Sequence, residues 1–195
     1  PLLWIERNWG GRKKIHEGLL QHIEDMNVKA ADLVVVVSEP LATIVEGKGV
    51  PRDRILVNPN GVDIDKFHPE ISGEEIRKSY GLQEKLVIGF IGSFGAWHGA
   101  EILAEAFGIL GKTGALDDDQ YRLLMIGDGN TMEEVKAQLH KYSVMDKVVL
   151  TGTVQQVQAS KYLAACDILV SPHVRNTDGS PFFGSPTKLF EYMAM

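Results

Sequence analysis

The chain has 195 residues, of which 44% are hydrophobic and 24% are charged, and its formal net charge is −6. This is the composition of a globular protein with one large or two small cores, and the acidic balance gives no electrostatic basis for nucleic-acid binding. The single cysteine, Cys166, excludes an intramolecular disulfide and favours a reducing compartment, so we expect a cytoplasmic protein. The longest aliphatic run, LVVVV, is far too short to span a membrane.

The first third of the chain alternates strand-like and helical patterns. We expect strands at residues 2–5, 32–38 and 54–59, and helices at residues 16–31 and 39–48. Ser38 is placed to cap the second helix and Gly49 to end it. The basic run GRKK at residues 11–14 is read as a solvated loop rather than a membrane or phosphate patch.

A turn-rich segment, NPNGVDIDKFHPE, follows the third strand and is the expected linker between two domains. The predicted division is residues 1–58, linker 59–73 and residues 74–195. Asp63 and Asp65 imitate a metal-binding Asp-x-Asp motif, but in this linker they are read as a turn and helix-entry pair. We therefore predict no metal site.

The alternation resumes after the linker. Strands are expected at residues 86–92, 122–129, 147–152 and 167–173, and helices at residues 100–110, 132–142 and 155–166, with one more at the end. Continuous aliphatic strands between helices indicate the α/β class with parallel sheets covered on both faces. Four strands are fewer than the five or six usual in doubly wound domains, so we expect the second domain, and likewise the first, to be truncated.

Glycines recur where the strands of the second series end, at Gly92, Gly127, Gly129 and Gly152. Ligands bind at the carboxyl ends of parallel strands, and glycine lets backbone amides approach a phosphate closely. The pattern favours a nucleotide or phosphate site. The alternative is that these glycines only form turns.

The last stretch, SPTKLFEYMAM, reads as a helix start with Ser185 as N-cap and Pro186 as the first helical residue. Lys188 then faces the positive end of the helix dipole, which costs roughly 0.3–1 kcal/mol. An anion held between its ammonium group and the helix amides would explain this placement, and a side chain extended into solvent is the alternative. Glu191 lies three residues on, along the same face.

Several motifs together resemble one known family. The linker segment, GFIGSFGAWHGAEILAEAF, MIGDG, VVLTGTV and FFGSPTKLFEYMAM are similar, in order and spacing, to family-4 retaining glycosyltransferases of the GT-B fold. The resemblance implies two Rossmann-like domains and metal-independent transfer of a sugar from a nucleoside diphosphate sugar. It implies no cofactor besides this donor substrate.

The resemblance also implies roles for individual residues. Glu191 would accept hydrogen bonds from the ribose hydroxyls, and the loop at Thr153 and Val154 would contact the base. The backbone at Ser185, Pro186, Thr187 and Lys188 would hold the diphosphate. The other implied donor-binding residues are Gly92, Ser93, Trp97, His98, Gly99, Gly127 and Gly129.

Three positions depart from the family pattern. Phe183 stands where the first motif glutamate is expected, and Ser93 and His98 stand where an arginine and a lysine usually bind phosphate. Lys188 is placed to replace one of these cations, so we predict Lys188 and His98 as the catalytic residues. His98 either binds phosphate or merely packs or caps a helix, and Trp97 is either a wall of the cleft or a hydrophobic anchor.

The expected acceptor is a carbohydrate, a lipid-linked or a small molecule. Residues upstream of this chain would supply most acceptor contacts and any peripheral contact with the cytoplasmic face of a membrane. The chain as given is expected to bind donor without turnover. The alternatives are a non-catalytic GT-B nucleotide-binding module and a UDP-sugar epimerase, against which the linker argues.

Overall fold

The structure is a computed structural model that describes residues 17–174 and 183–195. These residues form two compact units, one of residues 17–60 and 183–186 and the other of residues 61–174 and 187–195. The strand predicted at residues 2–5 and the basic run at residues 11–14 lie outside the described residues.

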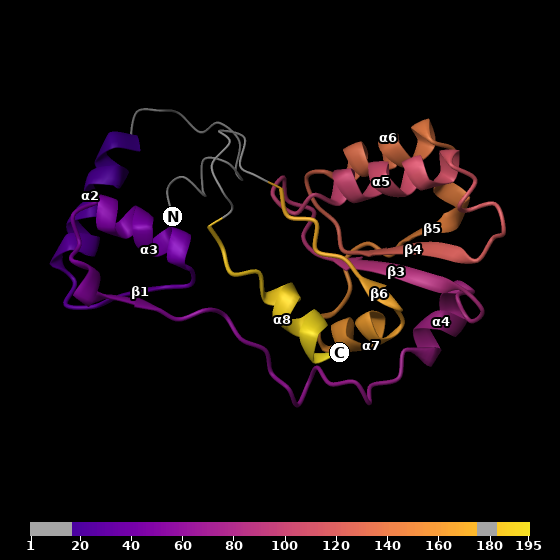
Figure 1. The fold of residues 1–195 in the computed structure, drawn as a ribbon, viewed down its shortest axis with the longest axis horizontal. Helices are drawn as coiled ribbons and strands as arrows, with labels where there is room; N and C mark the ends of the chain where they lie inside the picture. Colours follow the sequence, from indigo (N-terminus) through magenta and orange to yellow (C-terminus); the bar gives the residue numbers. More distant parts are fainter. Residues whose placement is uncertain (1–16, 175–182) are drawn as a thin grey trace. The chain divides into compact units, whose positions relative to one another are not determined.

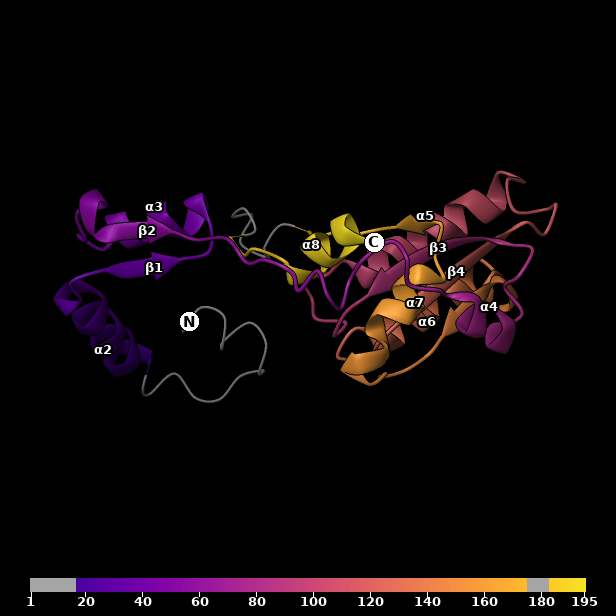
Figure 2. The ribbon, with the colours of Figure 1, turned by 90° about the horizontal axis from the view of Figure 1, so that it is seen from below.

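The first unit contains a short parallel sheet of two strands, with one helix before the first strand and another between the two strands. Its elements are α2 (Glu17–Ala30), β1 (Val34–Val36), α3 (Glu39–Gly47), a 3₁₀ turn (Arg52–Arg54) and β2 (Ile55–Val57). Strands β1 and β2 pair in parallel with Val34 opposite Ile55, and α3 lies along them (Figure 2). Ser38 caps α3 as predicted, because its hydroxyl accepts a hydrogen bond from the Leu41 amide.

A small core and a returning segment hold the first unit together. Val36, Ala42 and Val45 pack with Val50 and Ile55. The Ser38 hydroxyl donates a hydrogen bond to the Phe183 carbonyl, and the Asn60 amide donates one to the Ser185 hydroxyl. Residues far apart in the sequence therefore meet in this unit.

The second unit is built on a four-stranded sheet, and every strand pair in it is parallel, as predicted. The strands are β3 (Leu86–Ile91), β4 (Tyr121–Ile126), β5 (Val148–Leu150) and β6 (Ile168–Leu169), in the order β5-β4-β3-β6. Because all pairs are parallel, the carboxyl ends of the strands lie at one edge of the sheet.

Helices cover both faces of this sheet (Figure 1). They are α4 (Glu74–Tyr80), α5 (Ala100–Lys112), α6 (Met132–Lys141), α7 (Ala159–Ala164) and α8 (Thr187–Ala194). Strand β4 shows why: Leu123 and Met125 join the core beneath α5 and α6, whereas Leu124 and Ile126 join the core that includes residues of α4 and α7. Because β4 carries apolar side chains on both faces, helices must cover both faces of the sheet to keep these side chains from water.

Some predicted elements are shorter than expected, and one was missed. The helix predicted at residues 155–166 is a 3₁₀ turn (Gln156–Gln158) followed by the six-residue α7. The strand predicted at residues 167–173 pairs only over β6, since the chain then leaves the sheet. Helix α4 was not predicted because it buries a single residue, Ile76, and so has little apolar periodicity.

The last helix also begins later than predicted. Helix α8 starts at Thr187, not at Pro186, and the hydroxyl of Ser185 accepts its hydrogen bond from Asn60 instead of from the helix. Ser185 is therefore not the N-cap of α8. Its hydroxyl instead links residues 183–186 to Asn60 within the first unit.

Candidate functional site

Two loops that follow β3 and β4 pack tightly against each other at the carboxyl edge of the second sheet. A Cβ atom on Gly127 would lie 1.8 Å from the Gly92 carbonyl oxygen, and one on Gly129 would lie 1.9 Å from the Ser93 carbonyl oxygen. Both glycines also have positive φ, 123° and 154°. The Thr131 amide and hydroxyl both donate to the Phe94 carbonyl at 3.0 Å. Gly127 and Gly129 are thus required by backbone packing, whatever the loops bind.

A second close approach joins the start of α5 to the segment after β6. Gly99 caps α5 with φ 67°, and a Cβ atom there would lie 1.9 Å from the Pro172 carbonyl oxygen. The Val174 amide donates to the Trp97 carbonyl at 3.3 Å. This packing brings the ring of His173 to 5.9 Å from the ring of His98.

Lys188 lies at the centre of the site and does not extend into solvent. The side chain is 7% exposed, and its Nζ lies 4.3 Å from the centroid of the Phe90 ring. Two nitrogens pack against the backbone of Gly92: a Cβ atom on Gly92 would lie 2.7 Å from Lys188 Nζ and 3.1 Å from His98 Nδ1. The solvated alternative for Lys188 is therefore wrong.

The two converging nitrogens have no hydrogen-bond partner among the described residues. Buried polar atoms are nearly always paired, and leaving one unpaired costs about 1–3 kcal/mol, more for a charged group. The Phe90 ring compensates the ammonium group only in part. An acceptor bound beside Gly92 would satisfy both donors at once.

The electrostatics of the site disfavour positive charge when no ligand is bound. Burial lowers the pKa of Lys188 to about 8, which Glu191 partly opposes. Burial, and then the positive charge of Lys188, lowers the pKa of His98 to about 4. The pKa of His173 is lowered for the same two reasons, and burial raises that of Glu191. A bound anion would raise the pKa values of Lys188, His98 and His173, opposite to the effect of burial.

The remaining predicted residues fall into three groups. Trp97 packs its ring 5.0 Å from that of His98 and over Gly95, which fits the anchor interpretation. Thr153 is exposed and Val154 packs against the core that includes α7; among the described residues neither side chain forms a hydrogen bond or ion pair. Thr187 is exposed at the start of α8.

Sequence reasoning missed His173 as a member of this site. The ring is half-buried, and its Nδ1 lies 3.0 Å from the Ser171 hydroxyl. The signal was present, because Ser171 and His173 follow the aliphatic strand β6 at the carboxyl ends of the strands. It was obscured by extending the predicted strand through residue 173.

Asp63 and Asp65 form a turn, as the sequence indicated, but they do not begin a helix, since the next helix is α4 at Glu74. The Asp65 amide donates to Asp63 Oδ1 at 3.1 Å, and Asp63 pairs with Lys66 at 2.6 Å. Within residues 17–174 and 183–195, no three acidic, histidine or cysteine side chains gather as metal ligands. Nor is any helix in those ranges both long and apolar enough to cross a bilayer.

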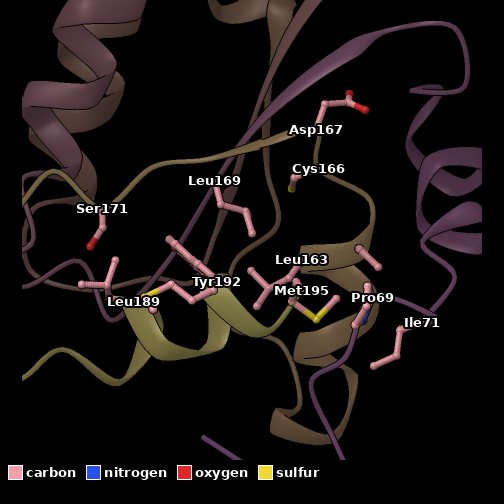
Figure 3. Close-up of a pocket in the computed structure, with 12 residues that line it drawn as sticks. Pro69, Ile71, Leu163, Cys166, Asp167, Leu169, Ser171, Leu189, Tyr192 and Met195 are labelled. Carbon is pink, nitrogen blue, oxygen red and sulfur yellow. The ribbon is translucent and has the colours of Figure 1, made fainter. Parts of the chain in front are cut away.

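A separate cavity of about 680 Å³ lies beside α7 and α8 (Figure 3). Leu163, Leu169 and Tyr192 line it together with Cys166, whose thiol donates to the Tyr162 carbonyl. Burial raises the pKa of this thiol to about 12, which disfavours the reactive thiolate. The cavity is not lined by Lys188, His98 or Glu191.

Comparison with known families gives two matches along the chain. Residues 85–195 match the family described as "Glycosyl transferases group 1", and residues 3–66 match "Glycosyltransferase Family 4". The two matches follow each other in the order expected for the two domains of the GT-B fold.

Characterised relatives are longer than this chain. It is 27% identical over 135 residues to the alpha-monoglucosyldiacylglycerol synthase of Streptococcus pneumoniae, covering 66% of this chain and 30% of the relative. It is also 27% identical to a D-inositol 3-phosphate glycosyltransferase of Xylanimonas cellulosilytica, with shares of 76% and 37%. The chain thus spans about a third of the length of these two curated relatives.

Solved structures share the fold. HepE of Anabaena, crystallised with UDP-glucose, superposes with a TM-score of 0.67 at 20% identity, covering 90% of this chain and 48% of HepE. Sucrose-phosphate synthase of Thermosynechococcus elongatus gives a TM-score of 0.62 at 19% identity, with shares of 89% and 42%. At these identities the likeness concerns the fold alone.

Proposed function

Because the chain belongs to the group 1 family of glycosyl transferases, we propose that its protein transfers a glycosyl group from a nucleoside diphosphate sugar to an acceptor, with retention of anomeric configuration. We assign donor binding to residues 74–195 and the acceptor side to residues 1–58, with residues 59–73 as the linker. The observation that carries the proposal is Lys188, a buried cation whose Nζ has no hydrogen-bond partner among the described residues and whose neighbour Glu191 offsets the cost of burial only in part.

The donor diphosphate supplies the missing counter-ion in this proposal. Its oxygens accept hydrogen bonds from Lys188 Nζ and His98 Nδ1, the two nitrogens that pack against Gly92, and from the first backbone amides of α8. When the glycosidic bond breaks, negative charge grows on the departing diphosphate. A fixed cation in a site shielded from water stabilises that charge more than water does.

Other residues hold the nucleoside in place. Glu191 lies one turn after Lys188 on α8 and accepts from the vicinal ribose hydroxyls, for which a carboxylate has two acceptor oxygens. The backbone near Thr153 and Val154 contacts the base, and Trp97 anchors the loop that carries His98. These residues act by positioning, which converts binding energy into rate.

The relatives indicate which donors and acceptors to test first. HepE was crystallised with UDP-glucose, so UDP-glucose is the first donor to test. The names of the relatives include a diacylglycerol glycolipid synthase, a glucosyltransferase for 2-deoxystreptamine and an enzyme for D-inositol 3-phosphate. Lipid-linked and small polar acceptors therefore both belong in the assay, as does a carbohydrate.

A second candidate is a nucleotide-binding module without transferase activity. It is favoured by Phe183, Ser93 and His98, which replace the glutamate, arginine and lysine of the family pattern. Such a module would bind the nucleotide sugar and leave its glycosidic bond intact.

Thermal unfolding of the full-length protein with UDP-, GDP- and ADP-glucose tests the proposal. A ligand present at 100 times its Kd stabilises the native state by about 2.7 kcal/mol, so one donor should raise the unfolding midpoint clearly. Isotope-labelled donor then separates the two candidates, because only a transferase moves label to an acceptor or to water. No midpoint shift with any donor would contradict both.

A further inference from the structure

The segment after β6 places a third base against the two nitrogens that face Gly92. The ring of His173 lies 5.9 Å from that of His98 with an interplanar angle of 82°, and Nδ1 of His173 lies 3.0 Å from the Ser171 hydroxyl. This arrangement depends on Gly99, whose missing side chain lets Pro172 approach α5. Ser171 therefore contacts His173, and His173 contacts His98, which is the residue assigned to the diphosphate.

The neighbouring groups decide how the two histidines titrate. Lys188 on α8 acts on both histidines, and Glu191, also on α8, acts on Lys188. Glu101, in the first turn of α5, has a buried Oε2 without a hydrogen-bond partner among the described residues. Without ligand, burial and Lys188 keep both histidines neutral near pH 7.

We propose that His173, held by Ser171, is a positioning residue of the donor site, which orients His98 toward the diphosphate and lets the histidine pair take up a proton from solvent when the diphosphate binds. The inference rests on the proposed function and deepens it, since it makes donor binding proton-linked. The histidine pair gains only one proton, because two imidazolium rings at this separation repel each other, and Lys188 adds its own proton uptake above about pH 7 as the diphosphate raises its pKa.

The direction of the pH dependence follows from linkage. The complex holds more protons than the free site, so affinity for the donor rises as pH falls. The dependence is at most about tenfold per pH unit for one proton. It ends where the free histidines themselves become protonated, which for His98 is near pH 4.

The test is isothermal titration of UDP-glucose into the full-length protein between pH 6 and 8.5, in buffers of different ionisation enthalpy. UDP-glucose suits this purpose because its diphosphate is esterified at both ends and does not titrate there, unlike the terminal phosphate of UDP. Wild-type protein should take up part of a proton per ligand at pH 6 to 7, where Lys188 is already charged in the free site and the uptake reports the histidines, and its affinity should fall steadily towards pH 8.5.

Two variants and a control assign that proton. His173→Asn should remove at least half of the uptake and flatten the pH profile, while uridine affinity stays unchanged. Ser171→Ala retains the imidazole but loses its anchor, so it should give a smaller loss and serves if the first variant is unstable. His140→Asn changes an exposed histidine at the end of α6 and should match wild type.

The outcomes separate the inference from the proposed function. UDP-glucose binding with no proton uptake, or uptake unchanged in both His173→Asn and Ser171→Ala, overturns the inference and leaves the proposed function standing. If UDP-, GDP- and ADP-glucose all fail to bind wild-type protein, the proposed function fails and the inference with it.

Discussion

The two edges of the second sheet carry clusters of cationic side chains that differ in whether they contain their own anion. At the amino edge, Lys85, Arg122 and Lys147 surround Asp119 at 2.8, 2.8 and 3.3 Å. At the carboxyl edge, Lys188 and His98 converge beside Gly92, and neither forms an ion pair among the described residues. The first cluster is complete as folded, whereas in our proposal the second takes its anion from the bound donor.

The difference appears in the titration of the central groups. Arg122, and next Lys85, hold the pKa of Asp119 well below its usual range, so this carboxylate keeps its charge in the folded protein. Burial moves the pKa of Lys188 the opposite way, against its charge, to about 8. In a self-contained ion cluster the fold shifts the pKa so that the charged form is stabilised. In an empty binding site the fold shifts the pKa so that the charged form is destabilised.

The largest expected effect concerns the loops that shape the carboxyl edge. Gly127→Ala should lower the free energy of unfolding by roughly 3 kcal/mol or more, because the new Cβ would collide with backbone and φ is positive. Gly81→Ala is the matched control: φ is 66° there but nothing lies within 4 Å, so the loss should be roughly 1–2 kcal/mol. Chemical denaturation measures both, and equal losses would contradict the close packing.

Lys188→Met should separate binding from stability. Affinity for a nucleoside diphosphate should fall by roughly 2–3 kcal/mol, the upper range for hydrogen bonds to charged groups, with little change for the bare nucleoside. Calorimetry with UDP and uridine measures the contrast. Lys136→Met, which removes an exposed lysine paired with Glu133, is the control and should change neither affinity. Equal weakening of UDP and uridine would remove Lys188 from the diphosphate site.

The same variant should be more stable than wild type in the absence of ligand, in a pH-dependent way. The folded pKa of Lys188, about 8, lies below the unfolded value of 10.5, so the charged lysine destabilises the fold fully below pH 8. That penalty is lost as pH rises from 8 to 10.5. The stability advantage of Lys188→Met should therefore shrink by roughly 2–3 kcal/mol across this window. A constant difference between the two proteins would contradict the lowered pKa.

Glu191→Ala should weaken nucleoside diphosphate binding by roughly 1–3 kcal/mol. The ribose role is specific, so the wild-type preference for UDP over its 2′,3′-dideoxy analogue should vanish in the variant. Competition binding with the two nucleotides measures this preference. If Glu191→Ala keeps the preference, the carboxylate does not bind the ribose.

The smallest effect on binding is expected at the amino edge. Asp119→Asn removes the anion shared by three cations and should lower the thermal midpoint, while donor affinity stays at the wild-type value. Because the folded pKa of Asp119 is depressed, its contribution is present above the unfolded pKa and declines as pH falls below it. The stability difference between the two proteins should therefore narrow in acid, and an altered donor affinity would contradict the separation of the two clusters.

The sequence predicted what depends on local pattern. Aliphatic runs such as Leu86–Ile91 between amphipathic segments indicated a parallel sheet, and strand-end glycines marked its carboxyl edge. Lys188 was singled out because it violates the charge preference of a helix start. Helix α4 was missed because one buried residue leaves no periodic signal.

What the sequence did not predict depends on tertiary packing. The burial of Lys188 over Phe90 joins residues 98 positions apart in the chain, and the approach of His173 to His98 depends on Pro172 meeting Gly99. The depressed basicity of the site follows from this burial, not from the residue types. Likewise, Gly127 and Gly129 were read as phosphate-contacting positions, and their packing role becomes visible only in the folded loops.

The most direct test of the central claim is the titration of Lys188 itself with and without donor. NMR of the ¹³Cε-labelled lysines, with Lys188→Met to assign the signal, reports this pKa in the full-length protein. Without ligand Lys188 should titrate near 8, and saturating UDP-glucose, or whichever donor binds, should raise that value by a unit or more because the diphosphate stabilises the ammonium group. A donor that binds and leaves the titration of Lys188 unchanged would contradict the assignment of the diphosphate to this site.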